Sequence, residues 1–491
     1  MSKRKRKKII NNIGKIIAII GLIITCIFAY YVLRLNILPT KYVILLALAI
    51  IFIYGIMYIF IFNKKIKTSL KIFASIILLT FAFAFIFGIK YIDRTIAFLD
   101  RINNNLSQTE EYYLYALKDS EYESISDYKN KKIGFYKSNT TKSIKTAVDT
   151  LNKKIKFEEK DYDDAQLLLE ALQNKEIDAI LVSGSLKAIF EEDYSYIMNK
   201  IKVITTVLVP IETSDIVKIV DVTNTPFNVY LIGSDTYGSI NKVSNSDVNI
   251  IITINPKTNQ ILLTSIPRDY YVMLYGYNEE RKTVYEKGMD KLTHSGYYGI
   301  ETSVKTVEKL LNTEINYYAR VNFTSVIEIV DSIGGIEVYS DYSFCDSGRV
   351  GCYKKGYNKL NGTQALAFAR ERKSFKGGDR VRGENQQKVI ASIINKMTSS
   401  TQLIKKYDTI LSKVEKSFQT NMDENSMTKL VKYQLNKMPK WEIINQNLNG
   451  SDKTVYEVFS FKNDNGIYVM QPNQETVDSA KEKIKEILSA K

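Results

Sequence analysis

Three uncharged apolar runs near the N-terminus constrain the fold of this chain more than any other feature. They are Ile16–Leu33, Tyr42–Asn63 and Ile72–Ile89. As a helix, each run is about long enough to cross the ~30 Å hydrocarbon core of a bilayer. We therefore predict three transmembrane helices within residues 13–91. A cleaved signal peptide is the alternative, but it does not account for three successive runs.

Lysine and arginine are distributed unevenly around these runs. Residues 1–12 begin MSKRKRKK, whereas the loop after the first run contains only Arg34 and Lys41. The loop after the second run is basic again, with Lys64, Lys65, Lys67 and Lys71. Since cytoplasmic loops are enriched in Lys and Arg, we predict a cytoplasmic N-terminus and a chain that lies outside the cell beyond residue 90. We interpret the basic N-terminus as a topology signal and expect no nucleic-acid partner.

The chain beyond the membrane is predicted to contain a stalk and a small domain. Apolar residues at helical spacing from Lys90 to Leu117 predict a helical stalk, which we assign to residues 92–127. Over residues 128–215 short strands alternate with helices, for example the strand Lys132–Tyr136 and the amphipathic helix Asp163–Asn174. This alternation predicts an accessory α/β domain. It shows no concentration of charged residues, which favours a packing or partner-docking role over a catalytic one.

Carboxylates mark strand boundaries in the larger domain that we predict over residues 224–400. Asp235 follows one predicted strand, Asp247 precedes the next, and Asp269 follows the third. Neighbouring antiparallel strands would bring these positions to one edge of a sheet. Three carboxylates beside Arg268 suit a hard divalent cation that shares its shell with phosphate oxygens. The alternative is that each aspartate only forms a turn.

A short basic stretch from residue 365 to residue 387 follows later in the same domain. It contains Arg370, Arg372, Arg380 and Arg382. Arg370 and Arg372 would share one face of an extended segment, and Asp379 would cap the next helix. Guanidinium groups remain charged and bind phosphate oxygens in pairs, so the stretch predicts a phosphate site, with a solvated basic loop as the alternative. Arg320, in an otherwise apolar predicted strand, must also find an anion.

Histidine and cysteine are scarce, which narrows the chemistry. The single histidine, His294, excludes two-histidine metal motifs and disfavours serine-protease-like catalysis, and we predict a lid or surface position for it. Cys345 and Cys352 flank a polar loop, and no CxxC pair is present that would indicate zinc. Outside the cell these cysteines would form a disulfide that stabilises by roughly 2.5 kcal/mol through loop entropy; two free thiols are the alternative.

Several separated phrases resemble the LytR-CpsA-Psr family of Gram-positive cell envelopes. They are FNVYLIGSD, NSDVNIIITINPKTNQILLTSIPRD, YYARVNFTSVIEIVDSIGGIEV, LNGTQALAFARERK and GDRVRGENQQKVI, in this order between Phe227 and Lys396. With the membrane anchor and the intervening α/β module, the chain is similar to the capsule-associated subgroup. The resemblance implies an α/β/α fold with a central mixed sheet and a hydrophobic tunnel for a polyprenyl chain.

The same resemblance implies an activity and a set of site residues. The activity is transfer of a glycan phosphate (capsule, teichoic acid or another envelope polymer) from a polyprenyl-pyrophosphate carrier to peptidoglycan. The implied cofactor is Mg2+, with Mn2+ as an alternative, held by Asp235 and Asp247. Asp269 would orient Arg268 or activate the acceptor hydroxyl. The pyrophosphate would be bound by Arg268, Arg370, Arg372 and Gln386, with Arg320, Arg380 and Arg382 as structural or more distant contributors.

One departure from the family and two other functions remain open. Where the family usually has Arg-Ser-Asp, this chain has Asn245-Ser246-Asp247, which removes one positive charge; Lys242 is close enough in sequence to compensate. With water as acceptor the same site would hydrolyse the pyrophosphate. Without bond cleavage, the protein would be an envelope-lipid-binding or regulatory protein. Residues 401–491 predict a helical extension, with apolar residues at Leu403, Ile404, Ile410, Leu411 and Val414.

Overall fold

The structure is a computed structural model of the whole chain. It describes residues 3–104, 108–136, 141–211, 216, 218–238, 240, 244–278, 280–399, 413–414 and 416–491. The chain forms two compact units: one combines Met1–Arg101 with Asp423–Lys440, and the other combines Ile102–Met422 with Trp441–Lys491. Lys242 and the apolar residues predicted to form a helix between 403 and 411 lie outside the described residues.

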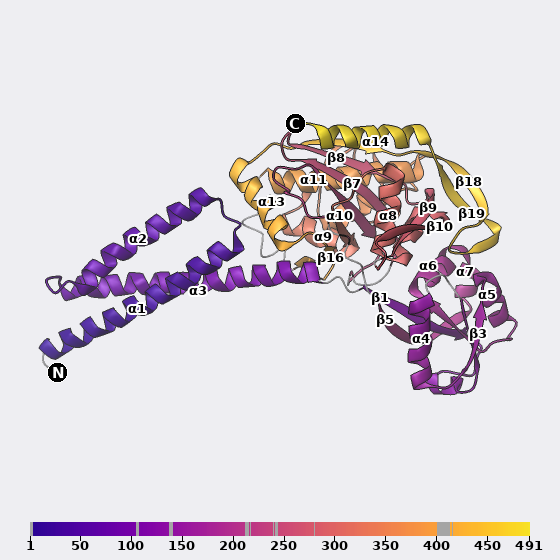
Figure 1. Cartoon of the computed structure of the whole chain (residues 1–491), viewed down its shortest axis with the longest axis horizontal. Helices are drawn as coiled ribbons and strands as arrows, with labels where there is room; N and C mark the ends of the chain where they lie inside the picture. Colours follow the sequence, from indigo (N-terminus) through magenta and orange to yellow (C-terminus); the bar gives the residue numbers. More distant parts are fainter. Residues whose placement is uncertain are drawn as a thin grey trace. The chain divides into compact units, whose positions relative to one another are not determined.

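Three long helices dominate the first unit: α1 (Lys3–Leu35), α2 (Thr40–Phe62) and α3 (Thr68–Asn104) (Figure 1). Each contains an apolar segment long enough to cross a membrane, and the shortest, α2, has 23 residues. At 1.5 Å per residue this helix is about 35 Å long, which exceeds the hydrocarbon core. The prediction of three membrane-spanning helices is confirmed, and these helices anchor the protein in a membrane.

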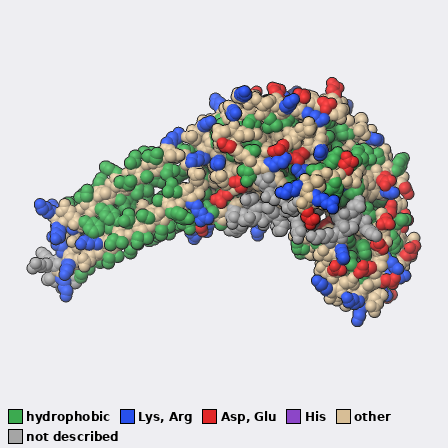
Figure 2. Space-filling view, in the orientation of Figure 1, with side chains coloured by type: hydrophobic (Ala, Val, Ile, Leu, Met, Phe, Trp, Pro, Cys, Tyr) green, Lys and Arg blue, Asp and Glu red, His purple; other side chains and the backbone are tan. Residues whose placement is uncertain are grey.

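Polar side chains inside this unit find partners across the helices. The Thr25 hydroxyl donates to the Tyr54 hydroxyl oxygen at 2.7 Å, and the Tyr58 hydroxyl donates to the Ala18 carbonyl at 2.6 Å. Such pairing is required where no water is available. Many large apolar side chains of these helices are exposed, and apolar side chains cover most of the face of the helices drawn in Figure 2. Helix α13 (Glu424–Lys437) completes the unit.

The second unit begins with the accessory α/β domain. The predicted stalk is wrong in its second half, because α3 ends at Asn104 and β1 starts at Gln108 as part of a sheet. The sheet has the order β3-β2-β4-β1-β5, in which β2 runs parallel to β3 and β4 while β1 runs antiparallel to both its neighbours. Its strands are β1 (Gln108–Leu117), β2 (Lys132–Tyr136), β3 (Glu158–Tyr162), β4 (Ala179–Ser183) and β5 (Ile201–Ile211).

Helices cover both faces of this accessory sheet. They are α4 (Thr141–Lys154) on one face, and α5 (Ala165–Gln173) and α6 (Gly184–Asp193), followed by the short α7 (Ser195–Met198), on the other. The alternation predicted from the sequence is confirmed, although β3 starts three residues later than the strand that the sequence predicts over Ile155–Glu158. The β3 strand is exposed at the sheet edge, so it lacks the apolar pattern that would have marked its start.

A six-stranded mixed sheet forms the centre of the main domain, in the order β16-β11-β6-β7-β8-β17. The β6-β7-β8 segment is antiparallel, whereas β11 runs parallel to β6 and β17 runs parallel to β8. The strands are β6 (Phe227–Ser234), β7 (Val248–Asn255), β8 (Gln260–Ser265), β11 (Tyr317–Asn322), β16 (Phe418–Thr420) and β17 (Glu442–Asn447).

Helices pack on both faces of this sheet, which confirms the expected α/β/α architecture (Figure 1). One face is covered by α8 (Ile300–Leu311) and α14 (Gln474–Ser489), whose apolar residues share a core with Tyr230, Ile251 and Leu262. The other face is covered by α9 (Phe323–Ser332), α10 (Gly362–Arg370) and α11 (Gly378–Thr398). Here Ile390 and Ile394 of α11 pack on Ile250 and Leu263.

The C-terminal part is not the helical extension that the sequence predicted. Strands β16 and β17 form the two edges of the main sheet, and β18 (Gly450–Glu457) pairs with β19 (Lys462–Pro472) in a long hairpin. Among the residues that the structure describes there, α13 and α14 match predicted helices. Most of these strands are short or half-exposed, so their apolar patterns are weak compared with those of the β6-β7-β8 segment.

The β18-β19 hairpin joins the accessory domain to the main domain. Its buried residues Phe461, Ile467 and Val469 share an apolar cluster with residues of α5 and α6, including Leu168. The Tyr194 hydroxyl donates to the Lys462 carbonyl at 2.5 Å. The accessory domain therefore packs on the hairpin, in agreement with the packing role predicted for it.

Candidate functional site

The ends of β6 and β8 and the start of β7 meet at one edge of the main sheet. Gly233 of β6 pairs with Val248 of β7, and the Asp247 amide donates to the Gly233 carbonyl at 2.8 Å. This register places Asp247 next to the β6 terminus that leads to Asp235. The β8 strand then delivers Arg268, whose Nη1 lies 2.5 Å from Asp247 Oδ1. The structure thus brings the predicted residues Asp235, Asp247 and Arg268 together.

The third carboxylate, Asp269, does not join the other two. Its Oδ2 lies 3.6 Å from Nε of Arg268, and its Oδ1 lies 4.0 Å from Nζ of Lys291. Asp269 is buried and lines neither of the two cavities beside the site. The prediction of a three-carboxylate cation site is therefore wrong, and the position of Asp269 agrees with the alternative that it orients Arg268.

The side chain of Asp247 is largely buried, and its surroundings shift the pKa of its carboxyl group in opposite directions. Burial raises the pKa of its carboxyl group and the nearby Asp235 acts in the same direction, whereas the Arg268 guanidinium lowers that pKa. Its Oδ2 atom is buried and has no hydrogen-bond partner among the described residues. Within that part of the chain, no cluster of three or more acidic, thiol or imidazole side chains could hold a metal. A cation here would need oxygens from a substrate or from water besides Asp235 and Asp247.

Two arginines come from the end of α10. Arg370 is the last residue of that helix, so the predicted extended conformation over Arg370 and Arg372 is wrong. The next residue, Glu371, caps the helix with an extended backbone, and Arg372 lines the same cavity as Arg370. The guanidinium carbon of Arg370 lies 4.0 Å from the centre of the Phe323 ring, which fixes the direction of an otherwise exposed side chain.

Helix α11 contributes a second group of residues. It starts at Gly378, so Asp379 lies in its first turn and does not cap it as predicted. Asp379 instead forms an ion pair with Arg382 one turn later. Burial raises the pKa of Asp379, while the Arg382 guanidinium opposes that rise. The Gln387 side chain donates to the carbonyls of Leu263 and Gln446, which attaches α11 to the sheet edge beside the site.

Two cavities meet at this group of charged residues. One has a volume of about 450 Å³ and is mainly apolar, with Leu231, Val321, Leu366, Val389 and Ile393 among its walls. The other has a volume of about 410 Å³ and is mainly polar. The residues that line both cavities are Asp247, Arg268, Arg382 and Gln386. Asp235, Arg370 and Arg372 line only the apolar cavity, and Arg380 lines only the polar one.

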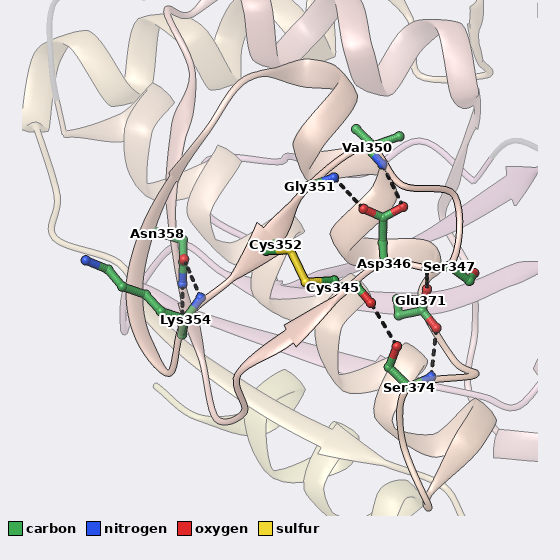
Figure 3. The surroundings of a disulfide bond; sticks show 10 residues. All are labelled: Cys345, Asp346, Ser347, Val350, Gly351, Cys352, Lys354, Asn358, Glu371 and Ser374. Atoms are coloured by element: carbon green, nitrogen blue, oxygen red, sulfur yellow. Dashed lines mark hydrogen bonds between the residues drawn. A yellow bond between two sulfur atoms is a disulfide. The ribbon is translucent and has the colours of Figure 1, made fainter.

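A disulfide-closed loop forms part of the wall of the apolar cavity (Figure 3). Cys345 and Cys352 are bonded, which confirms the predicted disulfide. Inside the loop, the amides of Val350 and Gly351 donate to the carboxylate of Asp346 at 3.2 and 2.6 Å. The Ser347 amide donates to Glu371 at 2.6 Å, so the loop is attached next to the two arginines at the end of α10.

Comparison with known proteins assigns the family. The sequence model of the LytR_cpsA_psr family matches residues 194–486, more than half of the chain. The chain belongs to the LytR-CpsA-Psr family. Its most similar relatives include the polyisoprenyl-teichoic acid–peptidoglycan teichoic acid transferase TagU of Bacillus anthracis, at 36% identity over 41% of this chain and 62% of that protein.

Two further relatives complete the comparison. The biofilm regulatory protein A of Streptococcus mutans is 33% identical over 41% of this chain and 52% of its own length. Among solved structures, the crystal structure of Bacillus subtilis TagU is 31% identical with a TM-score of 0.41, covering 55% of this chain and 99% of that one. The match thus spans less than two thirds of the length of these curated LytR-CpsA-Psr relatives.

Arg320, like Asp269, is a predicted site residue that lines neither of the two large cavities. Side chains alternate along β11, so Val321 faces the apolar cavity while Arg320 faces α8 on the other side of the sheet. There its Nη1 donates to Gln419 Oε1 at 2.9 Å, and burial lowers the pKa of its guanidinium to about 10. Arg320 has a structural position and does not contact either cavity at the site.

The departure from the LytR-CpsA-Psr pattern at Asn245 lies on the same side as Arg320. Both residues border a small cavity of about 10 Å³, together with Gly296 and Ser303. The Asn245 side chain lines neither of the two larger cavities. Its Oδ1 is buried without a hydrogen-bond partner among the residues described. Asn245 therefore contributes nothing to the walls of the two larger cavities.

His294 is buried, so its predicted lid or surface position is wrong. Its Nδ1 lies 2.6 Å from Asp290 Oδ1 and 3.2 Å from the Ser460 hydroxyl. Since both partners are at the same ring nitrogen, the arrangement is not that of a nucleophile and its base. The three residues connect β10 (Thr283–Lys291) to the loop of the β18-β19 hairpin, and His294 stacks on Tyr297.

The sequence reasoning missed several residues of the polar cavity. They come from α11, from the C-terminal strands and from the connection between β17 and β18: Asp379, Asn447, Asn449, Asp452 and Tyr468. For Asp452 and Tyr468 the sequence did contain a usable signal. The runs KTVYEVF and GIYVM are rich in Val and Tyr, and the segment SFKNDN between them contains Asn and Asp, which is typical of a β-hairpin.

Proposed function

We propose that this protein transfers a glycan phosphate from a polyprenyl-pyrophosphate carrier to a hydroxyl group of peptidoglycan. The observation that supports this proposal is a charged centre of arginines and carboxylates placed where an apolar and a polar cavity meet. A lipid diphosphate needs an apolar wall for its chain and cations for its phosphates. The name of the TagU relative supports the same reaction, with teichoic acid as one candidate polymer.

The donor would bind with its prenyl chain in the apolar cavity and its diphosphate at the arginines. Arg370 and Arg372 are exposed at the rim of that cavity, and Arg268 is held in place between Asp247 and Asp269. Guanidinium groups bind phosphate oxygens in bidentate pairs and keep their charge at any relevant pH. Gln386 borders both cavities and would add an amide hydrogen bond.

The residues present fit a magnesium ion. Asp235 and Asp247 are neighbours, and the buried Oδ2 of Asp247 offers a lone pair that no described residue uses. In proteins Mg2+ is usually held by one or two carboxylates and completes its shell with water and substrate phosphate oxygens. When bound, Mg2+ would neutralise charge on the diphosphate; Mn2+ is the alternative ion.

Transfer is a displacement at the phosphorus atom that carries the glycan. The acceptor oxygen forms a new bond to this phosphorus, and the bond from phosphorus to the bridging oxygen breaks. Polyprenyl monophosphate leaves with the electron pair, and the arginines stabilise its charge. The hydroxyl proton passes to a carboxylate. Asp379 suits this step better than Asp269, because Asp379 lines the polar cavity and its pKa is raised by burial.

This reaction requires the main domain to lie outside the cytoplasm. The basic N-terminus and the basic loop between α2 and α3 favour a cytoplasmic N-terminus with three crossings. The Cys345–Cys352 disulfide supports an oxidising compartment for the main domain. Labelling of intact cells with an impermeant thiol reagent tests this orientation, using cysteines introduced at Lys65 and at Tyr357. Only the cysteine at Tyr357 should react.

The transfer itself is tested with the full chain in lipid nanodiscs. The assay combines a polyprenyl-pyrophosphate glycan, peptidoglycan oligomers and Mg2+, and separates the products by mass. Arg372→Ala should reduce turnover by about 100-fold or more, as expected for loss of a charge that acts on the transition state. Arg281→Ala, an exposed arginine outside both cavities, is the matched control. Unchanged turnover in Arg372→Ala would exclude the proposed site.

The same assay separates the two rival functions. A hydrolase releases glycan phosphate at equal rates with and without peptidoglycan, whereas a transferase forms a peptidoglycan-linked product. Retention of the lipid without any cleavage would indicate a binding or regulatory protein, a class that the name of the Streptococcus mutans relative suggests for that protein.

A further inference from the structure

The polar cavity beside the charged centre has a wall that none of the predicted site residues accounts for. That wall is built by the end of β17 and by the β18-β19 hairpin, which supply Asn447, Asp452, Tyr468 and Met470. We propose that this cavity is the acceptor subsite and that it binds a saccharide of the peptidoglycan strand. The inference rests on the proposed transfer and adds the position and recognition chemistry of the acceptor.

The composition of this wall fits a sugar. The Tyr468 hydroxyl donates to Asp452 Oδ1 at 2.9 Å, which orients the ring of a residue that remains 44% exposed. An aromatic face beside a carboxylate matches a pyranose, whose C–H face is apolar and whose hydroxyls are donors. Asn447 Oδ1 is buried and has no hydrogen-bond partner among the described residues. This oxygen can accept from a sugar hydroxyl or amide, which would satisfy an otherwise costly buried group.

The geometry of displacement distinguishes the acceptor from the glycan of the donor. In phosphoryl transfer the attacking and leaving oxygens lie roughly in line through phosphorus. The leaving lipid phosphate points into the apolar cavity, so the attacking hydroxyl must come from the opposite side. The polar cavity shares Arg268 and Asp247 with the apolar one, but its other walls come from α11 and the C-terminal strands. A saccharide in it is therefore the nucleophile rather than the sugar already attached to phosphorus.

The accessory domain packs against the face of the hairpin that points away from the cavity. Ile467 and Val469 flank Tyr468 on β19 and point to the opposite face, where both are fully buried against the accessory domain. Tyr468 and Asp452 share the face that borders the cavity. The accessory domain thus supports the acceptor subsite without contributing a side chain to it. Because the ring of Tyr468 is not part of that core, its removal should leave the hairpin folded.

Binding of the acceptor can be measured without turnover. The probe is a GlcNAc–MurNAc tetrasaccharide without lipid, titrated into the full chain in nanodiscs and followed by saturation-transfer NMR and calorimetry. We expect saturable binding by the wild type, and a loss of at least about tenfold in affinity for Tyr468→Ala and Asp452→Ala. Tyr468→Phe, which keeps the ring, should bind with intermediate affinity. Tyr456→Ala is the matched control, since Tyr456 lies on the same hairpin, is 65% exposed and does not line the cavity.

Steady-state kinetics then assign the sugar to acceptor or donor. We expect Tyr468→Ala to raise the KM for the acceptor at least about tenfold while the KM for the lipid donor changes by less than about twofold. A rise in donor KM with an unchanged acceptor KM would overturn the assignment. The assignment would also be overturned if the wild type transfers glycan but Tyr468→Ala leaves the affinity for the acceptor unchanged. If the wild type binds the tetrasaccharide at Tyr468 but transfers nothing, the subsite stands and the proposed function fails.

Discussion

Removal of Arg268 should affect stability as well as turnover, because this arginine neutralises a buried carboxylate. The side chains of Arg268 and Asp247 are only 13% and 11% exposed, and their closest atoms are 2.5 Å apart. Loss of one partner of a buried pair costs about 3–5 kcal/mol. We expect Arg268→Ala to lie near the lower value, since the Thr293 hydroxyl, 3.4 Å from the same Asp247 oxygen, still donates.

The double variant provides the decisive comparison. Asp247→Asn in the Arg268→Ala background removes the uncompensated charge, so it should recover about 1–3 kcal/mol through coupling between the two sites. Unfolding in urea can be followed at Trp441, the single tryptophan, which packs against the core between the sheet and α11. Arg372→Ala is the control. Arg372 is exposed, so its substitution should change stability by less than about 0.5 kcal/mol.

The pH dependence of Arg268→Ala has a definite sign. Without the guanidinium, burial and Asp235 both raise the pKa of Asp247 in the folded protein above its value in the unfolded chain. The folded state then binds the proton more tightly, so stability is greatest below the unfolded pKa, about 3.9. It is lost as pH rises through the folded pKa. Two results would refute the buried-pair reasoning. One is an equal loss of unfolding free energy in Arg268→Ala at pH 4 and pH 8, and the other is a double variant in which the destabilising effects of the two substitutions simply add.

Three further predictions concern the remaining elements. Arg320→Met should lower stability by about 1–3 kcal/mol, because Gln419 loses a buried donor, yet leave the donor KM unchanged, which urea unfolding and kinetics can check together. Substitution of Cys345 and Cys352 by serine should lower stability by up to roughly 2.5 kcal/mol and raise the donor KM. Treatment of the wild type with dithiothreitol should have the same effects. An unchanged donor KM would show that the loop does not shape the cavity. Mg2+ affinity, measured by calorimetry, should fall on acidification with a midpoint above the ordinary aspartate pKa of about 3.9, because Asp247 must lose its proton; a midpoint at or below that value would contradict its raised pKa.

The carboxylate and arginine positions were accessible from the sequence because they depend on local patterns. Asp235 and Asp247 flank strands that follow each other in an antiparallel meander, so their approach needs only the correct register. Asp269 could not be assigned in the same way. It follows Arg268 directly, and only the packing of Lys291 behind it shows that its carboxylate turns away from the cation site.

The alternation of side chains along a strand sets a second limit on what the sequence can predict. Arg320 and Val321 are adjacent in an apolar strand, and the sequence does not show which face of the sheet borders the cavity. The tertiary structure decides this through α8 on one side and α9 to α11 on the other. The same packing buries His294, whose partner Ser460 is 166 residues away along the chain.

The sequence by itself predicted four properties: the membrane anchor, the α/β alternation of the accessory domain, the disulfide and the family. Each of them depends on composition or on the spacing of residues that lie close together in the chain. The polar cavity could not be predicted in this way, because its walls join α11 to strands about 60 to 90 residues later in the chain. Its existence depends on β17 pairing parallel to β8 and on the accessory domain supporting β19. Contacts between segments so far apart are selected by the burial of whole faces, which no local pattern encodes.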